Sequence, residues 1–188
     1  MSVSLTKGDL FTLTDSQQHL LLGLGWDARS SDGAPFDLDA VVFMLNASNQ
    51  VNADDGFIFY NQPQSTCGGI THQGDNRIGD AHGDDEVVQV DLSKIPQNVE
   101  KLIFAVTIHD YEARKQNFGQ VRRAYIRLVN QKTKAEIARF DLTEDASIAT
   151  AMVFGELHRL NQGWKFKASA DPKNCGLLEL AQSYGVKL

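Results

Sequence analysis

The segment GDNRIGDAHGDDE, residues 74–86, concentrates carboxylates to a degree that calls for a chemical explanation. From Asp75 onward it carries one cation, Arg77, and five acidic residues: Asp75, Asp80, Asp84, Asp85 and Glu86. Hard cations such as Ca²⁺ take about six to eight oxygen ligands from carboxylates, carbonyls, asparagine side chains and water. Glycines between short acidic side chains let the chain turn tightly and expose its carbonyls. Because Mg²⁺ needs fewer protein oxygens in a tighter octahedron, the pattern favours Ca²⁺.

A second acidic stretch, GWDARSSDGAPFDLDA, contains four aspartates: Asp27, Asp32, Asp37 and Asp39. Asp37 and Asp39 are two residues apart at the start of a predicted strand, so in extended chain their side chains point the same way. Strand-end loops gather at one edge of a β-sandwich, where both aspartates can face a metal held by the later loop. The alternative is that both acidic runs are solvated surface.

Two other interpretations of the acidic loop are weaker. With Asp75 in the first position of an EF-hand, Arg77 and Gly79 would occupy ligand positions, so that template fails. Glycoside hydrolysis by paired carboxylates needs an acid with a raised pKa in an aromatic-lined cleft, whereas this loop is crowded and rich in glycine. No GxSxG or HExxH motif occurs, and we expect the protein not to be an enzyme.

The histidines give no catalytic pattern of their own. His109 precedes Asp110 and suggests an acid–base pair, but a hydrogen-bonded histidine at a strand end is the simpler expectation. His72 and His82 flank the acidic loop, and simple exposure is expected for both.

Composition sets wider bounds on the function. The chain has 188 residues, is 42% hydrophobic and carries a net charge of −6, which argues against a nucleic-acid partner. We expect one domain over residues 1–188, since no linker or repeat interrupts it. Without an apolar run of transmembrane length or a secretory signal, the expected location is the cytoplasm. Cys67 and Cys175 are expected to be free thiols.

The elements that must position the acidic residues are mostly strands. Alternating or β-branched runs occur at 39–46, 56–62, 86–92, 101–110, 123–131 and 138–142, and a hairpin is predicted over 154–170. Trp26 and Trp164 are expected in the core. Helical periodicity appears at 176–185, and a short turn of helix is possible at 111–116. The chain is therefore predicted to be all-β: a β-sandwich of two mainly antiparallel sheets with a few short helices, one at the C-terminus.

Several motifs together resemble the TerD domain family of tellurite-resistance and stress-response proteins. They are LGWDARSSDGAPFDLDA, FIFYNQ, HQGDNRIGDAHGDDE, VTIHDYEARKQNFGQV and VFGELHRLNQGWKF, and the resemblance covers essentially the whole chain. It implies a β-sandwich with two adjacent Ca²⁺ ions at one end.

The resemblance also implies a set of metal ligands. Carried onto this sequence, they are Asp37, Asp39, Asp75, Asn76, Asp84, Asp85 and Glu86. Asp27 is a further candidate, either as a ligand or as a residue supporting the site. Relative to the family pattern, His82 replaces a carboxylate and Asp80 is one methylene shorter than the usual Glu. The expected function is a Ca²⁺-dependent interaction module, with other Ter-type stress proteins as partners, including ones at the membrane surface. The alternative is a scaffold permanently held by Ca²⁺.

Overall fold

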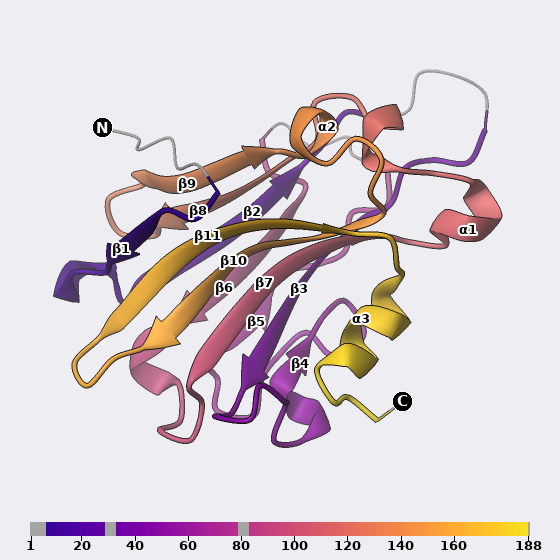
Figure 1. Cartoon of the computed structure of the whole chain (residues 1–188). Coiled ribbons are helices and arrows are strands. Elements are labelled where there is room, and N and C mark those ends of the chain that lie inside the picture. The colour runs from indigo at the N-terminus through magenta and orange to yellow at the C-terminus, as the bar shows by residue number, and fades with distance from the viewer. Residues whose placement is uncertain (1–6, 29–32, 79–82, 188) are drawn as a thin grey trace.

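Two antiparallel β-sheets, packed face to face, make up most of the molecule (Figure 1). The computed structural model describes residues 7–28, 33–78 and 83–187. The first sheet has six strands in the order β1-β11-β10-β7-β3-β4: Leu10–Thr12, Trp164–Lys173, Ala151–Arg159, Lys101–Ile108, Leu38–Leu45 and Phe57–Ile58. The second has five strands in the order β5-β6-β2-β8-β9: Ile70–His72, Glu86–Asp91, His19–Gly25, Tyr125–Asn130 and Glu136–Asp141. The predicted all-β sandwich is confirmed.

Short helices occupy the connections. The α-helices are α1 (Tyr111–Arg114), α2 (Leu142–Asp145) and α3 (Leu177–Ser183). The 3₁₀ helices are η1 (Asp15–Gln17), η2 (Asp54–Gly56), η3 (Leu92–Lys94) and η4 (Phe118–Gln120). The predicted C-terminal helix and the short turn after β7 are therefore both present. None of the described helices has the length and apolarity needed to span a bilayer.

The main core lies between the two sheets. Strand β3 is buried on both faces, because its even-numbered residues, such as Val42, face the other sheet while Val41 and Phe43 face α3. This double burial explains why the strand is apolar at every position from Ala40 to Leu45 rather than alternating. Trp26 and Trp164 are both buried in the main core, as the sequence predicts.

Strand β2 was not predicted from the sequence. Its residues Gly23 and Gly25 interrupt the alternation, and each leaves room for a side chain from another strand or loop. A Cβ atom added at Gly23 would lie 2.3 Å from Asp84 Oδ2, and one at Gly25 would lie 2.5 Å from Cζ of Tyr125. Here glycine is needed for close approach rather than for a turn.

Distant parts of the chain meet at the edge of the first sheet. Strand β1 pairs with β11, where Leu10 lies opposite Lys167, and Phe11 packs against Phe166 with ring centroids 5.4 Å apart. The short strand at the beginning of the chain is thus held by the last strand.

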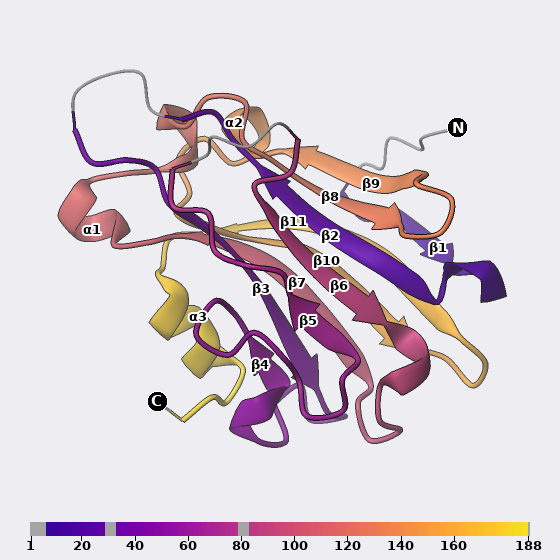
Figure 2. The same ribbon diagram turned by 180° about the vertical axis from the view of Figure 1, so that it is seen from behind.

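Four strand ends assemble at one end of the sandwich, next to α1 (Figure 2). The start of β6 lies beside the end of β2, where Glu86 is opposite Leu24, and the start of β3 lies beside the end of β7. The backbone N–H of Ala40 on β3 donates to Glu86 Oε2 on β6 at 2.7 Å, which joins the two sheets. This end carries the described members of both acidic stretches: Asp27, Asp37, Asp39, Asp75, Asp84, Asp85 and Glu86. Asp32, Asp80 and His82 lie outside the described residues.

Candidate metal centre

Three predicted ligands come together at this end. Asp37, Asp39 and Asp75 each place one carboxylate oxygen so that the three oxygens lie within 4.8 Å of one another. Asp37 and Asp39 point the same way from the start of β3, as their spacing predicts, and Asp75 reaches them from the acidic loop. Asp37 and Asp39 are buried, whereas Asp75 is exposed.

The carboxylate of Asp39 is the least compensated of the three. The residue is 2% exposed, and its Oδ2 atom has no hydrogen-bond partner. Burial, followed by the charges of Glu86, Asp37 and Asp75, raises the pKa of this carboxyl to about 9, against the weaker opposing effect of Arg114. A buried carboxylate surrounded by like charges takes up either a proton or a cation.

Two arginines partly compensate the negative charge of the Asp37 carboxylate. Its Oδ2 atom lies 3.6 Å from Arg114 Nη1 and 3.8 Å from Arg77 Nε. Burial nevertheless raises the pKa of Asp37, and the charge of Asp75 adds to that rise. Neither arginine is within hydrogen-bonding distance of the carboxylate, so its oxygens remain available to a cation.

Glu86 lies deep between the sheets beside this cluster. It is 1% exposed; Oε2 accepts the Ala40 hydrogen bond and lies 3.4 Å from His72 Nε2, while Oε1 has no hydrogen-bond partner. Burial raises the pKa of Glu86, although the His72 and Ala40 contacts act in the opposite direction. Glu86 thus adds a second buried oxygen without a partner to the one on Asp39.

Asp85 and Asn76 order the loop. Asp85 Oδ2 accepts the backbone N–H of Trp26 at 2.8 Å, and Asp85 Oδ1 accepts from Asn76 Nδ2 at 3.0 Å. Asn76 Oδ1 in turn accepts the backbone N–H of Ile78 at 3.1 Å. These bonds hold both arms of the acidic loop against the end of β2.

Asp84 and Asp27 are instead paired with arginines. Asp84 Oδ1 and Oδ2 accept from Nε and Nη2 of Arg127 at 2.8 and 3.0 Å, and Oδ1 also accepts from the hydroxyl of Tyr125. Asp27 accepts from Nε and Nη2 of Arg123 at 2.9–3.0 Å. Their ligation of a metal stays a prediction, and for both it would require the arginine to share or release the carboxylate.

The residues present fit a hard cation. Three carboxylates converge, two buried oxygens on Asp39 and Glu86 have no partner, and all the converging groups are oxygen donors, the ligand type that Ca²⁺ prefers. Buried charges without a partner are costly, and a bound cation would remove that cost.

Sequence reasoning did not foresee the burial of His72. His72 is 4% exposed rather than exposed as expected, because it lies on the inward face of β5. The pattern Ile70-Thr71-His72 carries that signal, since it continues the alternation of a short strand. His109 is a partly buried strand-end histidine, with Nε2 3.5 Å from Asp110 Oδ2 and Nδ1 3.9 Å from Asp39 Oδ2.

Comparison with known proteins gives matches that cover nearly the whole chain. A family model described as "TerD domain" matches residues 1–184. Tellurium resistance protein TerD of Serratia marcescens is 52% identical over 99% of this chain and 98% of its own length. General stress protein 16U of Bacillus subtilis is 46% identical, with 100% of both chains covered.

The fold also matches a solved structure. A homologue of telluride resistance protein (TerD) from Streptomyces coelicolor superposes with a TM-score of 0.75 over 88% of this chain and 95% of that chain. The two sequences are 20% identical, so this likeness concerns the fold alone.

Proposed function

The chain belongs to the TerD domain family, and we propose that it is a cytoplasmic calcium-binding protein acting in resistance to tellurium compounds and related stresses. The tellurium and stress roles are taken from the names of its relatives, and the calcium site from its own residues. None of those relatives has an enzymatic name, which supports a binding role rather than catalysis.

One observation carries the calcium proposal. Asp37, Asp39 and Asp75 bring three carboxylate oxygens within 4.8 Å of one another, while Asp39 Oδ2 and Glu86 Oε1 are buried without partners. These four residues would hold the ion, and Asn76 and Asp85 would keep the loop in place. The ion would supply a fixed positive charge in place of the proton that Asp39 otherwise retains.

The arrangement suits a charge-dependent interaction module. Without a cation, the converging carboxylates make this end of the sandwich strongly negative; with one, most of that field is cancelled. Other Ter-type stress proteins, including ones at the membrane surface, are the proposed partners. A partner that binds this end would therefore distinguish the metal-free protein from the metal-bound protein.

The second candidate function is a scaffold that Ca²⁺ holds together permanently. The Ala40–Glu86 hydrogen bond between the sheets favours it, because an ion at Glu86 would strengthen an existing link. Affinity separates the two functions: a micromolar site responds to changes in cytosolic Ca²⁺, whereas a nanomolar site stays filled.

The test is calorimetric titration of chelator-stripped protein with Ca²⁺, and with Mg²⁺ as a control. We expect saturable Ca²⁺ binding in preference to Mg²⁺, with the stoichiometry giving the number of ions. Asp75→Asn should weaken binding at least ~10-fold, since it removes one charged ligand from an exposed position where folding is unaffected.

The matched control is Asp110→Asn, a nearby exposed carboxylate outside the cluster. It adopts a left-handed backbone conformation, with φ of 50°, that asparagine tolerates, so little change in affinity is expected. No binding at millimolar Ca²⁺, or equal losses in the two variants, would refute the proposed site.

A further inference from the structure

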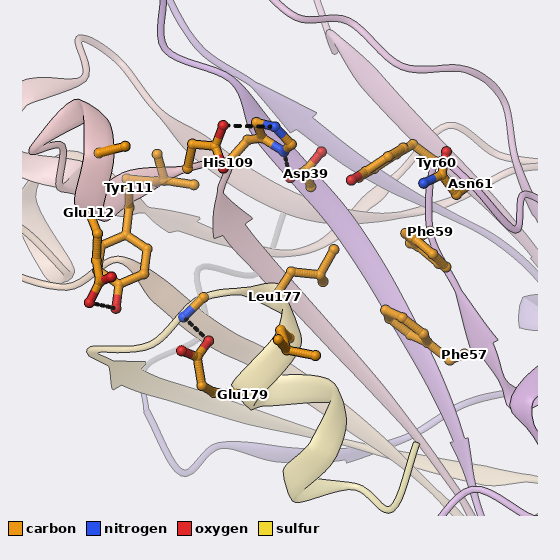
Figure 3. Close-up of a pocket in the computed structure, with 15 residues that line it drawn as sticks. Asp39, Phe57, Phe59, Tyr60, Asn61, His109, Tyr111, Glu112, Leu177 and Glu179 are labelled. Carbon is orange, nitrogen blue, oxygen red and sulfur yellow. Dashed lines mark hydrogen bonds and ion pairs between the residues drawn. The ribbon is translucent and has the colours of Figure 1, made fainter. Parts of the chain in front are cut away.

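A pocket of about 540 Å³ lies next to the carboxylate cluster, between α1, α3 and the segment that follows β4 (Figure 3). Its volume is typical of sites for small organic ligands. The ring of Tyr111 lies on one side and those of Phe57 and Phe59 on the other, with Leu177 between them in the view. The pocket therefore has an apolar middle with opposed walls.

Acidic groups surround this apolar middle. Four carboxylates line the pocket: Asp39, Asp110, Glu112 and Glu179. Among the described lining residues, the single base is His109, which already lies between two of these acids. Asp39 contributes a buried Oδ2 without a hydrogen-bond partner at the inner end.

The negative field extends over both walls. Burial and then the charges of Asp39 and Asp75 raise the pKa of Tyr60, whereas for Tyr111 burial is followed by the charges of Glu112 and Glu179. Two tyrosines on different elements are thus affected by two different sets of carboxylates. A ligand with a positive group would meet favourable charge throughout the pocket.

The aromatic wall is fixed by ring packing. Phe43, Phe57 and Phe59 stack in series, with centroids 4.9 and 4.3 Å apart, and Tyr60 meets the edge of Phe59 at 5.1 Å. Tyr60 also packs at 71° to the ring of His109. Aromatic faces held in place beside carboxylates are the features that recognise ammonium and guanidinium groups.

We propose that this pocket binds an amphipathic organic cation, that is, an ammonium or guanidinium group on a short apolar or aromatic body. The charged group would lie among the carboxylates, and the body would lie between the aromatic wall and Leu177. Such a group is found on free amines and on lysine or arginine side chains of a peptide.

This site goes beyond the calcium proposal and does not depend on it. Asp39 belongs to both sites, but Asp110, Glu112 and Glu179 are outside the metal cluster. Measurements in chelator therefore test the pocket alone. Added Ca²⁺ should weaken cation binding several-fold, because the ion replaces the proton of Asp39 and so adds positive charge beside the pocket.

The first experiment compares probes of one shape and three charges on the full chain in chelator. They are 2-phenylethylamine, 2-phenylethanol and 3-phenylpropionate, titrated by calorimetry and by methyl NMR of Ile108, Leu177 and Leu178. We expect the amine to bind at least ~10-fold more tightly than the alcohol and the propionate not to bind. Shifts should be confined to the methyl groups of these three pocket residues.

A second set of probes, two capped peptides, tests whether the cation comes from a protein partner or from a small metabolite. Capped Ala-Phe-Lys-Ala is compared with the same peptide carrying Gln in place of Lys. Binding of the Lys peptide alone assigns the pocket to a protein partner, and binding of the amine alone assigns it to a metabolite. Binding of both confirms the shared chemistry.

The first variants keep the shape of the acidic side chains and remove their charge. Glu112→Gln with Glu179→Gln removes two charges and leaves an oxygen at residue 179 to accept the Gly176 N–H. We expect amine affinity to fall about 10-fold. The matched control, Glu100→Gln with Asp171→Asn, removes two charges outside the pocket and should change affinity less than about two-fold.

A further variant tests the aromatic wall. Tyr60→Leu removes a ring face but keeps apolar volume. We therefore expect the affinity for the amine to fall about three-fold and the affinity for the alcohol to stay unchanged. Equal affinity for amine and alcohol in chelator, or an unaltered affinity in the Glu112/Glu179 double variant, would overturn the proposal whatever Ca²⁺ does.

Discussion

Asp39 and Asp84 lie at the same end of the sandwich, but their surroundings are opposite. Asp84 is held by two hydrogen bonds from Arg127 and one from Tyr125 over the gap left by Gly23. Asp39 is more deeply buried, is surrounded by other carboxylates, and has an oxygen without a partner. Protein groups neutralise Asp84, whereas one buried oxygen of Asp39 has no such partner. Equal acidity in sequence therefore conceals two different roles.

The largest expected difference between the two aspartates is in Ca²⁺ affinity. Asp39→Asn removes the central carboxylate and should weaken binding about 100-fold, while Asp84→Asn should change it less than about three-fold. Calorimetric titration of the two variants measures this. A comparable loss of Ca²⁺ affinity in both variants would place Asp84 among the ligands and show that the two aspartates act alike.

The next prediction concerns the free energy of unfolding of the metal-free protein. Arg127→Ala leaves the half-buried carboxylate of Asp84 without its main partner and should lower the free energy of unfolding by about 2 kcal/mol. Asp39→Asn should lower it little near neutral pH, because an uncharged amide replaces a carboxyl that holds its proton there. Urea unfolding in chelator provides the measurement. A destabilisation by Asp39→Asn as large as that by Arg127→Ala would mean that Asp39 is already compensated.

The last prediction concerns the pH dependence of the metal-free protein. The pKa of Asp39 is about 9 in the folded state and near 3.8 when unfolded, so between these values the folded state binds the extra proton. The free energy of unfolding should then fall as pH rises from 5 to 9, by at most about 1.4 kcal/mol per pH unit for this group. Thermal unfolding in chelator tests the sign, and Asp39→Asn should flatten the profile. An unchanged slope in that variant would assign the dependence to another group.

Local sequence was sufficient for much of the fold and for part of the site. Alternating or β-branched runs predict strands β3, β6, β7 and β8 and the hairpin of β10 and β11, and the common direction of Asp37 and Asp39 follows from their spacing. Strand β2 was missed because glycines occupy two of its outward positions. The need for those glycines becomes visible only when Asp84 and Tyr125 are packed over them.

The division of the acidic residues into two groups is not encoded locally. Asp84 meets Arg127 because β2 pairs with both β6 and β8, an outcome of sheet order rather than of neighbouring residues. The burial of His72 and Glu86 likewise depends on how the two sheets pack. Spacing predicts which side chains share a face, but only tertiary structure shows which of them find a partner.

The pairing of β1 with β11 has a consequence for how the protein is made. A ribosome releases the chain from its N-terminus, so Leu10 and Phe11 emerge long before Lys167 and Phe166, the residues that they pair with. Until the last hairpin leaves the exit tunnel, the first strand has no partner among the described residues, and Phe11 stays uncovered. The first sheet is therefore completed only after residues 164–173 have emerged, and chaperones that bind nascent apolar segments have that interval in which to act.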